Sequence, residues 1–348
     1  MRRGAKRLLL GLAAALLLSA TAAAGYGWMV YRQAERAAAR MYEPLAPAEP
    51  PLAYAAIPQP TRVIEAGGGL GTAGSGQSES AGRAAEPVSG PFAFASEARA
   101  QPSPEEGDPF TVLMMGVDER AHDRGRSDTM IVLGVNPARG SMLMFNIPRD
   151  TRTELVGRGT LDKINHAYAF GGVEMAVRTV ERFVGERIDY YVKVNMEGFA
   201  ELIDLLGGVR VDNPFAFDFE GYHYAAGEIE LTGEAALMYA RMRWDDPRGD
   251  LGRNARQREL LQRLLQRLVS LETLGRTGEL LDAAGDHVRT NLTFASMRGL
   301  ALDYGARLRD VQTTELAGRG RTIDGIWYYE VTREERDRVR RLLADQLR

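Results

Sequence analysis

The chain has 348 residues, of which 45% are hydrophobic and 26% are charged, so it can build one sizeable globular domain and still carry further segments. Its net charge of −3 argues against a general nucleic-acid-binding protein, which would carry a basic face or tail. The chain has no cysteine, and this excludes disulfides, thiol catalysis and zinc–thiolate sites.

The first 31 residues predict a membrane anchor. Residues 1–7 form a basic segment, and residues 8–31 carry no charge and are long enough to cross a bilayer as one helix. The basic flank predicts a single-pass cell-membrane protein with a cytoplasmic N-terminus and an extracytoplasmic remainder. A cleaved signal peptide is the alternative, because Ala22–Ala24 offers small residues near a cleavage site. The aromatic residues Trp28 and Tyr31 suit an outer interface and favour an uncleaved signal anchor.

Residues 32–108 are predicted to be an extracytoplasmic flexible linker. From residue 43 onwards Pro, Ala, Gly, Ser and Glu prevail, a composition typical of disorder. Its glycine-rich run lacks a following Gly-Lys-Ser/Thr and is therefore not a phosphate-binding loop. We expect the linker to hold the next domain away from the membrane on an adjustable tether.

A catalytic domain is predicted over residues 109–348. Three apolar runs predict buried strands over Phe110–Val117, Thr129–Val135 and Ser141–Ile147. Charged residues follow or precede these strands: Asp118, Asp128, Arg149 and Asp150. Ligands of α/β proteins bind where strands end, so this edge of the sheet is the expected site.

The remainder of the domain alternates predicted helices and strands. The expected helices cover residues 172–184, 196–206, 233–243, a leucine-rich stretch from 256, 294–304 and the C-terminus. The expected strands cover residues 190–195, 209–212, 311–316 and 326–331, and the aromatic stretch 213–222 reads as a loop. Thr232 is expected to cap one helix, and Thr332 with Glu335 to form a capping box for the last. The fold class is therefore α/β, with a mixed central sheet flanked by helices as an α/β/α sandwich.

Asp118 and Asp128 flank a loop between two neighbouring strands, which can bring their carboxylates together. Two carboxylates without a paired His or Cys suit a hard cation such as Mg²⁺, with Mn²⁺ as a possible substitute. The alternative is that each aspartate caps a turn or pairs with a nearby arginine such as Arg120 or Arg126.

A set of basic and amide side chains could hold phosphate, because guanidinium groups bind phosphate in a planar, bidentate way and lysine adds a point charge. The set consists of Arg126, Arg149, Lys163, Arg241, Arg243, Arg253 and Gln257. Only three of the 44 basic residues are lysines, so arginine abundance alone is weak support and Lys163 stands out. Surface salt bridges are the alternative for any one of them.

The stretch Arg241–Gln257 ends one helix and opens another. Counting back from Leu260 and Leu261 at helical spacing places Gln257 on the apolar side of the second helix. Arginines in a first helical turn meet an unfavourable dipole, and a bound anion would relieve that conflict. The alternative is that Asp245, Asp246 and Asp250 neutralise the arginines in a solvated loop.

With these residues assembled, the domain from about Pro109 to Leu316 resembles the LytR-CpsA-Psr family. Many short motifs occur in order, and they are 115–120, 126–130, 136–137, 147–151, 163–168, 171–172, 189–191, 194–195, 197–199, 207–209, 231–237, 239–243 and 249–257. Each motif is weak alone, whereas so many in the correct order are specific.

The resemblance implies a membrane-anchored envelope enzyme with an α/β/α fold and a hydrophobic lipid tunnel. Such enzymes transfer an anionic glycopolymer, for example teichoic acid, from a polyprenyl-pyrophosphate carrier to a muramic acid hydroxyl of peptidoglycan. The family's metal-binding aspartates fall on Asp118 and Asp128, and its pyrophosphate-binding residues on the seven residues of the set above. Within that set Arg126, Arg149, Arg241 and Arg243, together with Asp150, are the expected catalytic residues.

We expect a Mg²⁺-dependent phosphotransferase that releases polyprenyl phosphate, in which the lipid chain lies between the sheet and the helices. Either Asp118 or Asp150 could assist deprotonation of the attacking hydroxyl. Two alternatives stay open: hydrolysis of the polyprenyl pyrophosphate, and a non-catalytic lipid-binding or regulatory role at the envelope. The sequence does not name the glycopolymer or the oligomeric state.

Overall fold

The computed structural model describes residues 24–45, 101–119, 124–268, 277–300 and 310–348. Its centre is a mixed six-stranded sheet with the order β11-β6-β1-β2-β3-β12. These strands are β1 (Phe110–Val117), β2 (Ser127–Asn136), β3 (Ser141–Asn146), β6 (Tyr190–Asn195), β11 (Val288–Thr290) and β12 (Asp310–Thr313). β1 runs parallel to β6 and antiparallel to β2, and β3 runs parallel to β12.

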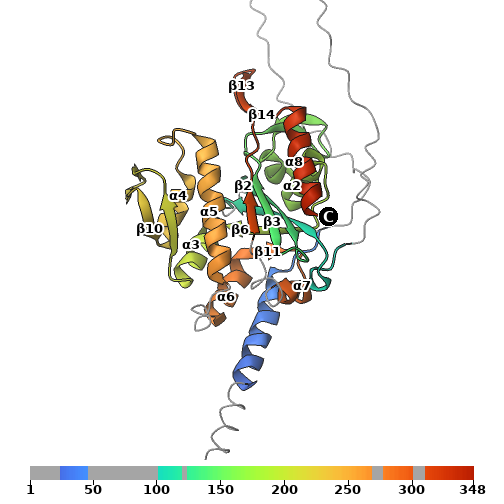
Figure 1. The fold of residues 1–348 in the computed structure, drawn as a ribbon, viewed down its shortest axis with the longest axis vertical. Coiled ribbons are helices and arrows are strands. Elements are labelled where there is room, and N and C mark those ends of the chain that lie inside the picture. The colour runs from blue at the N-terminus through green and yellow to red at the C-terminus, as the bar shows by residue number, and fades with distance from the viewer. Residues whose placement is uncertain (1–23, 46–100, 120–123, 269–276, 301–309) are drawn as a thin grey trace, which may run out of the picture.

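Alternating side chains of the strands face two separate cores, as the two-residue period of a strand requires. On β1, Leu113 and Met115 point into the core covered by α2 (His166–Val184) and α8 (Arg333–Gln346). Phe110 and Val112 point the opposite way, towards residues of α5 (Asp250–Leu268). Figure 1 shows the sheet between α2 and α8 on one side and α5 on the other. The predicted α/β/α sandwich with a mixed sheet is confirmed.

A smaller layer lies beyond α5. It contains α3 (Met196–Leu205), α4 (Gly233–Arg241) and the strands β7 (Val209–Asn213), β8 (Phe217–Phe219), β9 (Tyr222–Tyr224) and β10 (Gly227–Leu231). Its core is built largely from aromatic rings, with Tyr224 and Tyr239 fully buried and Phe217 stacked on Tyr224 at 4.7 Å. The hydroxyl group of Tyr224 donates to the carbonyl oxygen of Ala235 at 2.9 Å, which ties the hairpin to α4.

Several short strands were not predicted. The expected aromatic loop is the hairpin β8–β9, which turns at Glu220 and Gly221 with φ values of 50° and 82°. β10 pairs with β7, and two further hairpins join β4 (Arg152–Leu155) to β5 (Thr160–Lys163) and β13 (Arg319–Ile323) to β14 (Ile326–Glu330). Strands of three to five residues carry too few alternations to be separated from loops by periodicity.

Helix boundaries also differ from prediction. α5 begins at Asp250, not near Arg256, because the acidic residue suits the positive end of the helix dipole. α2 begins at His166 and is broken by Gly171 and Gly172, which have non-helical backbone angles. α4 ends at Arg241, so Arg243 lies beyond the helix that was expected to carry it. The amphipathic segment expected at 294–304 is α7 (Phe294–Gly299), and residues 301–304 lie outside the described ranges.

The two predicted caps are each half correct. Thr332 accepts a hydrogen bond from the amide of Glu335 at 3.2 Å, but the carboxylate of Glu335 accepts from the amide of Ala317 and pairs with Arg338. In a capping box the carboxylate of Glu335 would accept a hydrogen bond from the amide of Thr332, but here it accepts from a neighbouring segment. Thr232 is the N-cap of α4, but its side chain makes no cap hydrogen bond.

The predicted flexible linker 32–108 is wrong at both of its ends. Residues 24–41 form a helix in which Ala37 and Ala38 are buried, and a short 3-10 helix η1 (Pro104–Glu106) precedes β1. Burial of small apolar side chains against the domain fixes the first segment. Among the described residues, none forms a helix long and apolar enough to cross a membrane. Residues 8–23 of the predicted anchor and residues 46–100 of the linker lie outside the described ranges.

Close packing of α4 on α3 depends on a glycine. A Cβ atom added at Gly233 would lie 2.0 Å from the carbonyl oxygen of Ala200, which is backbone and cannot move aside. We expect Gly233→Ala to lower the free energy of unfolding by about 1–3 kcal/mol, measured by urea denaturation. Gly27→Ala is the control, because its Cβ would meet nothing within 4 Å. Equal midpoints for the two variants would contradict this packing.

Candidate functional site

A cavity of about 460 Å³ lies between the central sheet and α5. This size is within the range of small-molecule sites, and the walls are mostly apolar. Most of its lining comes from β1, β2, β6, α3, α4 and α5, and β8, β11 and loop residues complete it. The lining comprises Met114, Met115, Gly116, Asp118, Asp128, Thr129, Ile131, Arg149, Val192, Val194, Asn195, Met196, Phe199, Leu202, Phe219, Leu237, Ala240, Arg241, Arg243, Trp244, Arg253, Gln257, Leu260, Leu261, Leu264, Leu265 and Val288.

One face of α5 supplies both the polar and the apolar parts of this cavity. Arg253 and Gln257 are one helical turn apart, and Leu260, Leu261, Leu264 and Leu265 continue the same face. At 1.5 Å per residue the distance along the helix from Arg253 to Leu265 is about 18 Å. The predicted position of Gln257 on the apolar side of this helix is confirmed.

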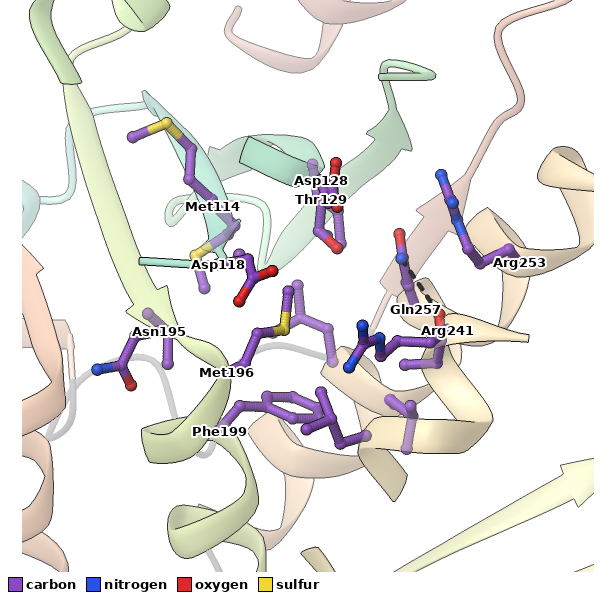
Figure 2. Close-up of a pocket in the computed structure, with 18 of the residues that line it drawn as sticks. Met114, Asp118, Asp128, Thr129, Asn195, Met196, Phe199, Arg241, Arg253 and Gln257 are labelled. Carbon is purple, nitrogen blue, oxygen red and sulfur yellow. Dashed lines mark hydrogen bonds between the residues drawn. The ribbon is translucent and has the colours of Figure 1, made fainter. Parts of the chain in front are cut away.

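The strand ends supply the acidic part of the site, as predicted. Asp118 follows the last residue of β1, and Asp128 is near the first residue of β2. Because β1 and β2 are antiparallel neighbours, these two positions lie at the same edge of the sheet. Both line the cavity, and the amide of Asp118 donates to the carbonyl oxygen of Arg126 at 3.3 Å. Figure 2 shows Asp118 and Arg241 on opposite sides of the cavity, with the side chains of Met196 and Phe199 extending into it from α3.

A chain of ion pairs connects the acidic edge to the residues after β3. Arg149 Nη1 lies 3.0 Å from Asp128 Oδ1, and its Nε lies 3.8 Å from Asp150 Oδ2. Lys163 Nζ lies 2.8 Å from Asp150 Oδ1. Burial lowers the pKa of Arg149, but the neighbouring carboxylates, Asp128 first, outweigh this effect and leave the pKa raised. The alternative that an arginine pairs with Asp128 is therefore met, but the partner is Arg149 and not one of the arginines close to it in sequence.

Arg253 is the most deeply buried of the arginines that line the cavity. The residue is 4% exposed, and its Nη2 lies 2.7 Å from Asp250 Oδ1. Even so, neither Nε nor Nη2 has a hydrogen-bond partner within the described residues. Burial lowers the pKa of this guanidinium, Asp250 opposes that effect, and the cations Arg149 and Arg243 add to it. Such a group is costly to bury without an anion.

Arg256, three residues further along α5, serves the fold. Its guanidinium donates to the carbonyl oxygens of Tyr239 and Met242 and forms a buried ion pair with Asp246. The alternative of a solvated loop, in which aspartates neutralise these arginines, is therefore partly right about the pairing. It is wrong about solvation, because Asp246 and Arg256 are both buried.

Two further side chains lie at the polar end of the cavity. Gln257 accepts from Asn146 Nδ2 at 3.2 Å and donates to the carbonyl oxygen of Ala240 at 3.4 Å, so its amide is held in place. The guanidinium of Arg243 stacks on the ring of Trp244 at 4.3 Å. Trp244 is 79% exposed and lines the cavity, and sequence reasoning missed it because a single tryptophan in a polar stretch has no periodic signal.

Most of the predicted site residues are brought together. Arg149, Arg241, Arg243, Arg253 and Gln257 line the cavity beside the two aspartates. Three do not line it. Arg126 is exposed, and Asp150 is paired with Lys163 and Arg149. Direct contact of these three with a ligand stays a prediction.

The acidic residues are too few for a metal site made of protein alone. No group of three or more His, Cys, Asp or Glu side chains suited to a metal occurs in the described part of the chain. Two carboxylates are enough only if water or a ligand completes the coordination, as is common for Mg²⁺ bound together with phosphate.

A family model described as the LytR_cpsA_psr family matches residues 75–345. The chain belongs to this family, as the sequence motifs predicted.

Two named relatives are polyisoprenyl-teichoic acid–peptidoglycan teichoic acid transferases TagU. The protein of Bacillus subtilis (strain 168) is 45% identical over 240 residues, which are 69% of this chain and 78% of that protein. The protein of Halalkalibacterium halodurans is 49% identical over 242 residues, or 69% of this chain and 80% of its own.

Solved structures agree in fold. The crystal structure of B. subtilis TagU is 41% identical, with a TM-score of 0.57, and the match covers 69% of this chain and 97% of that chain. A structure of TagT bound to LIIa-WTA is 28% identical, with a TM-score of 0.62, over 72% of this chain and 95% of that one.

Arg253 and Arg256 allow a matched comparison on one helix. We expect Arg253→Met to leave the unfolding midpoint of the ligand-free protein unchanged or raised, because a poorly compensated buried charge is removed. Affinity for geranylgeranyl diphosphate should fall about 10- to 100-fold, the value of a charge-assisted hydrogen bond. Arg256→Met should instead cost about 3–5 kcal/mol of stability, since Asp246 is left buried without a partner. Urea denaturation and titration calorimetry measure the two effects, and a large loss of stability in Arg253→Met would contradict this division.

Proposed function

We propose that the protein is a phosphotransferase that moves an anionic glycopolymer from a polyprenyl-pyrophosphate carrier to a peptidoglycan hydroxyl and releases polyprenyl phosphate. Support comes from the names of the TagU relatives, which specify a polyisoprenyl-linked teichoic acid and peptidoglycan. The observation that carries the proposal is an apolar cavity that ends at a buried, poorly compensated guanidinium group. An apolar chain with a phosphorylated head group has both of these properties.

The site suits a head group with several negative charges. Arg149, Arg241, Arg243 and Arg253 lie around the polar end of the cavity. Among the described ion pairs, Asp128 and Asp150 pair with Arg149, and Asp250 pairs with Arg253. Guanidinium forks bind phosphate oxygens in a bidentate manner. The diphosphate would therefore lie at this end, and the isoprenoid chain along Leu260–Leu265 of α5.

The reaction is a displacement at the sugar-linked phosphorus. The acceptor hydroxyl oxygen forms the new P–O bond while the bond to the polyprenyl phosphate oxygen breaks, and the hydroxyl proton leaves to a carboxylate or water. Arginines around the diphosphate neutralise the charge that develops on the leaving polyprenyl phosphate. In this proposal they position and stabilise, and no covalent enzyme intermediate is needed.

Of the two candidate bases, the geometry favours Asp118. Its carboxylate lines the cavity, whereas Asp150 is paired with Lys163 and Arg149 and does not line it. The oxygens of Asp150 already face the two cations with which it is paired. We therefore propose that Asp150 holds Arg149 and Lys163 in position and that Asp118 faces the acceptor.

Mg²⁺ fits the donor set as a cofactor. Asp118 and Asp128 would hold it, because hard cations bind one or two carboxylates together with substrate phosphates. When bound, such an ion neutralises charge on the diphosphate oxygens. Mn²⁺ prefers the same oxygen ligands and could substitute.

We further propose that the chain is a single-pass cell-membrane protein with an extracytoplasmic catalytic domain. Residues 8–31 are uncharged and follow a basic segment, as in a signal anchor. Peptidoglycan is an extracytoplasmic acceptor, so this orientation places the site and both substrates on the same side of the membrane.

The decisive experiment combines the full-length protein in lipid vesicles, a polyprenyl-diphosphate-linked teichoic acid precursor and a peptidoglycan oligomer. Transfer predicts a covalent product that requires Mg²⁺, is lost with EDTA and is strongly reduced in Arg243→Ala. Release of free sugar phosphate without covalent product would identify a hydrolase instead. Binding without turnover would identify a lipid-binding protein, and either result contradicts the transferase.

The two aspartates can be tested individually. We expect Asp118→Asn to slow transfer by about 100-fold, the scale of losing one contact to developing charge in the transition state, and to raise the Mg²⁺ concentration needed for half-activation. Asp324→Asn on the β13–β14 turn is the control, because it makes the same change far from the cavity. An unchanged Mg²⁺ dependence in Asp118→Asn would remove this residue from the metal site.

A further inference from the structure

The helix over residues 24–41 is attached to the catalytic domain along its second half. Ala37, Ala38 and Met41 are 0%, 3% and 9% exposed. Directly after the helix, Tyr42 forms a parallel bridge with Thr290 of β11, and the amide of Glu43 donates to the carbonyl oxygen of Thr290 at 2.8 Å. The hydroxyl group of Tyr191 donates to the carbonyl oxygen of Glu43 at 2.7 Å. The segment therefore joins the edge of the central sheet.

The same helix runs in register with α6 (Thr277–His287). A Cβ atom added at Gly278 would lie 3.3 Å from Gln33 Oε1, and one at Gly285 would lie 2.6 Å from Arg40 Nε. Both pairs are separated by seven residues in each helix, so the helices run parallel over about two turns. Glycines on α6 permit this close approach.

Ion pairs agree with this register. Arg40 Nη2 lies 2.7 Å from Asp282 Oδ1, and its Nη1 lies 3.3 Å from Asp286 Oδ1. Exposed pairs of this kind contribute little free energy. They fix which face of the helix turns towards α6, while the buried alanines and the bridge to Thr290 hold it there.

The first half of the helix carries exposed aromatic side chains. Trp28 is 65% exposed and Tyr26 is 52% exposed, and Trp28 stacks on Tyr31 at 6.0 Å between centroids. The ring of Tyr31 also meets the edge of Phe294 at 5.3 Å. Tryptophan and tyrosine gather at lipid–water boundaries, where the apolar ring and the polar group each find a suitable medium. These rings lie at the end of the uncharged stretch 8–31.

The aromatic end of the helix and the apolar end of the cavity lie on the same side of the domain. The leucines of the cavity approach the C-terminal end of α5, and Figure 1 shows that end of α5 beside α6. α6 continues directly into β11, and Val288, the first residue of β11, lines the apolar part of the cavity. Figure 1 shows the N-terminal helix leaving the molecule at the end where α6 and α7 lie. Trp28 is five residues before Gln33, so it lies about 8 Å beyond the contact with Gly278.

We propose that residues 24–43 form a rigid stalk, clamped on α6 and β11, whose aromatic end lies in the lipid–water boundary and turns the apolar end of the cavity towards the bilayer. The catalytic domain is thus held against the membrane at a fixed orientation, in contrast to an adjustable tether. What the cavity binds rests on the proposed function, whereas the clamp and the aromatic contact with lipid do not.

Cross-linking tests the clamp, and the absence of native cysteine makes the experiment clean. The full-length variant Gln33→Cys/Gly278→Cys, reconstituted in phosphatidylglycerol vesicles, should be joined in most molecules by a short bis-maleimide. Glu35→Cys/Gly278→Cys is the control, because residue 35 lies about 200° around the helix from residue 33. Equal cross-linking of the two pairs, or none in either, would overturn the rigid stalk.

Tryptophan fluorescence tests the membrane contact. The chain has three tryptophans, so W244F/W327F keeps only Trp28, and W28F/W244F keeps only Trp327 on the β13–β14 hairpin. In vesicles with lipids brominated near the head group, Trp28 should lose most of its emission and Trp327 should keep it. An unquenched Trp28, or equal quenching of both, would overturn the proposed orientation.

A variant that detaches the stalk tests whether the fixed orientation of the domain is needed for transfer from a donor in the membrane. Ala37→Arg places a long cation in the buried contact and should abolish the Gln33–Gly278 cross-link. We expect transfer from a long-chain donor in the vesicle to fall about 10-fold through lost positioning, while a short-chain soluble donor is used at an unchanged rate. Equal rates of vesicle transfer in wild type and variant would overturn the role of the stalk. If the wild type transfers from neither donor, the proposed function fails, and the cross-linking and quenching results still decide the stalk.

Discussion

The burial of Arg253 is the constraint on which the rest of the site depends. A guanidinium group that is almost fully covered needs acceptors, and Asp250 is its only nearby carboxylate among the described ion pairs. Arg149 and Arg243 increase the unfavourable potential at the same point. The fold tolerates the buried charge because the guanidinium group of Arg253 lines a cavity that an anion can enter. Because positive charge in the site is not fully compensated by the protein, binding of a ligand with more than one negative charge should be especially favourable.

The central sheet and α5 determine where the charged and the apolar residues of the cavity lie. Antiparallel pairing of β1 and β2 brings Asp118 and Asp128 to one edge, and the residues after β3 bring Arg149 to the same edge. α5 then runs along the sheet with its polar residues at this edge and its leucines further away. Charge recognition and apolar binding therefore share one helix face, and a ligand that satisfies both must be long and charged at one end.

Prediction succeeded where a signal repeats along the chain. β1, β3, β6 and α3 have long apolar runs or clear periods, and their boundaries were found within about two residues. The short hairpins were not predicted because they are held by tertiary contacts: β9 and β10 pack on α4, β4 and β5 pack on α2, and β14 packs on β4. Arg126 and Lys163 show the same limit for the site, since their chain positions match the family motifs but neither lines the cavity. The docked helix 24–41 was missed because Ala37 and Ala38 resemble linker residues until a partner covers them.

Arginine is abundant throughout this chain, so its abundance does not distinguish arginines that bind a ligand from those that stabilise the fold. The hydrogen-bond acceptors around each guanidinium group do distinguish them. The guanidinium group of Arg256 donates to two carbonyl oxygens and pairs with Asp246, and that of Arg258 contacts Asn146 and Glu315. Both hold α5 to its surroundings. Arg253, on the same helix and equally buried, has two nitrogens without a hydrogen-bond partner in the described structure. Because folding leaves few buried donors unpaired, this difference assigns Arg256 and Arg258 to stability and is the reason that we propose Arg253 as a ligand-binding residue.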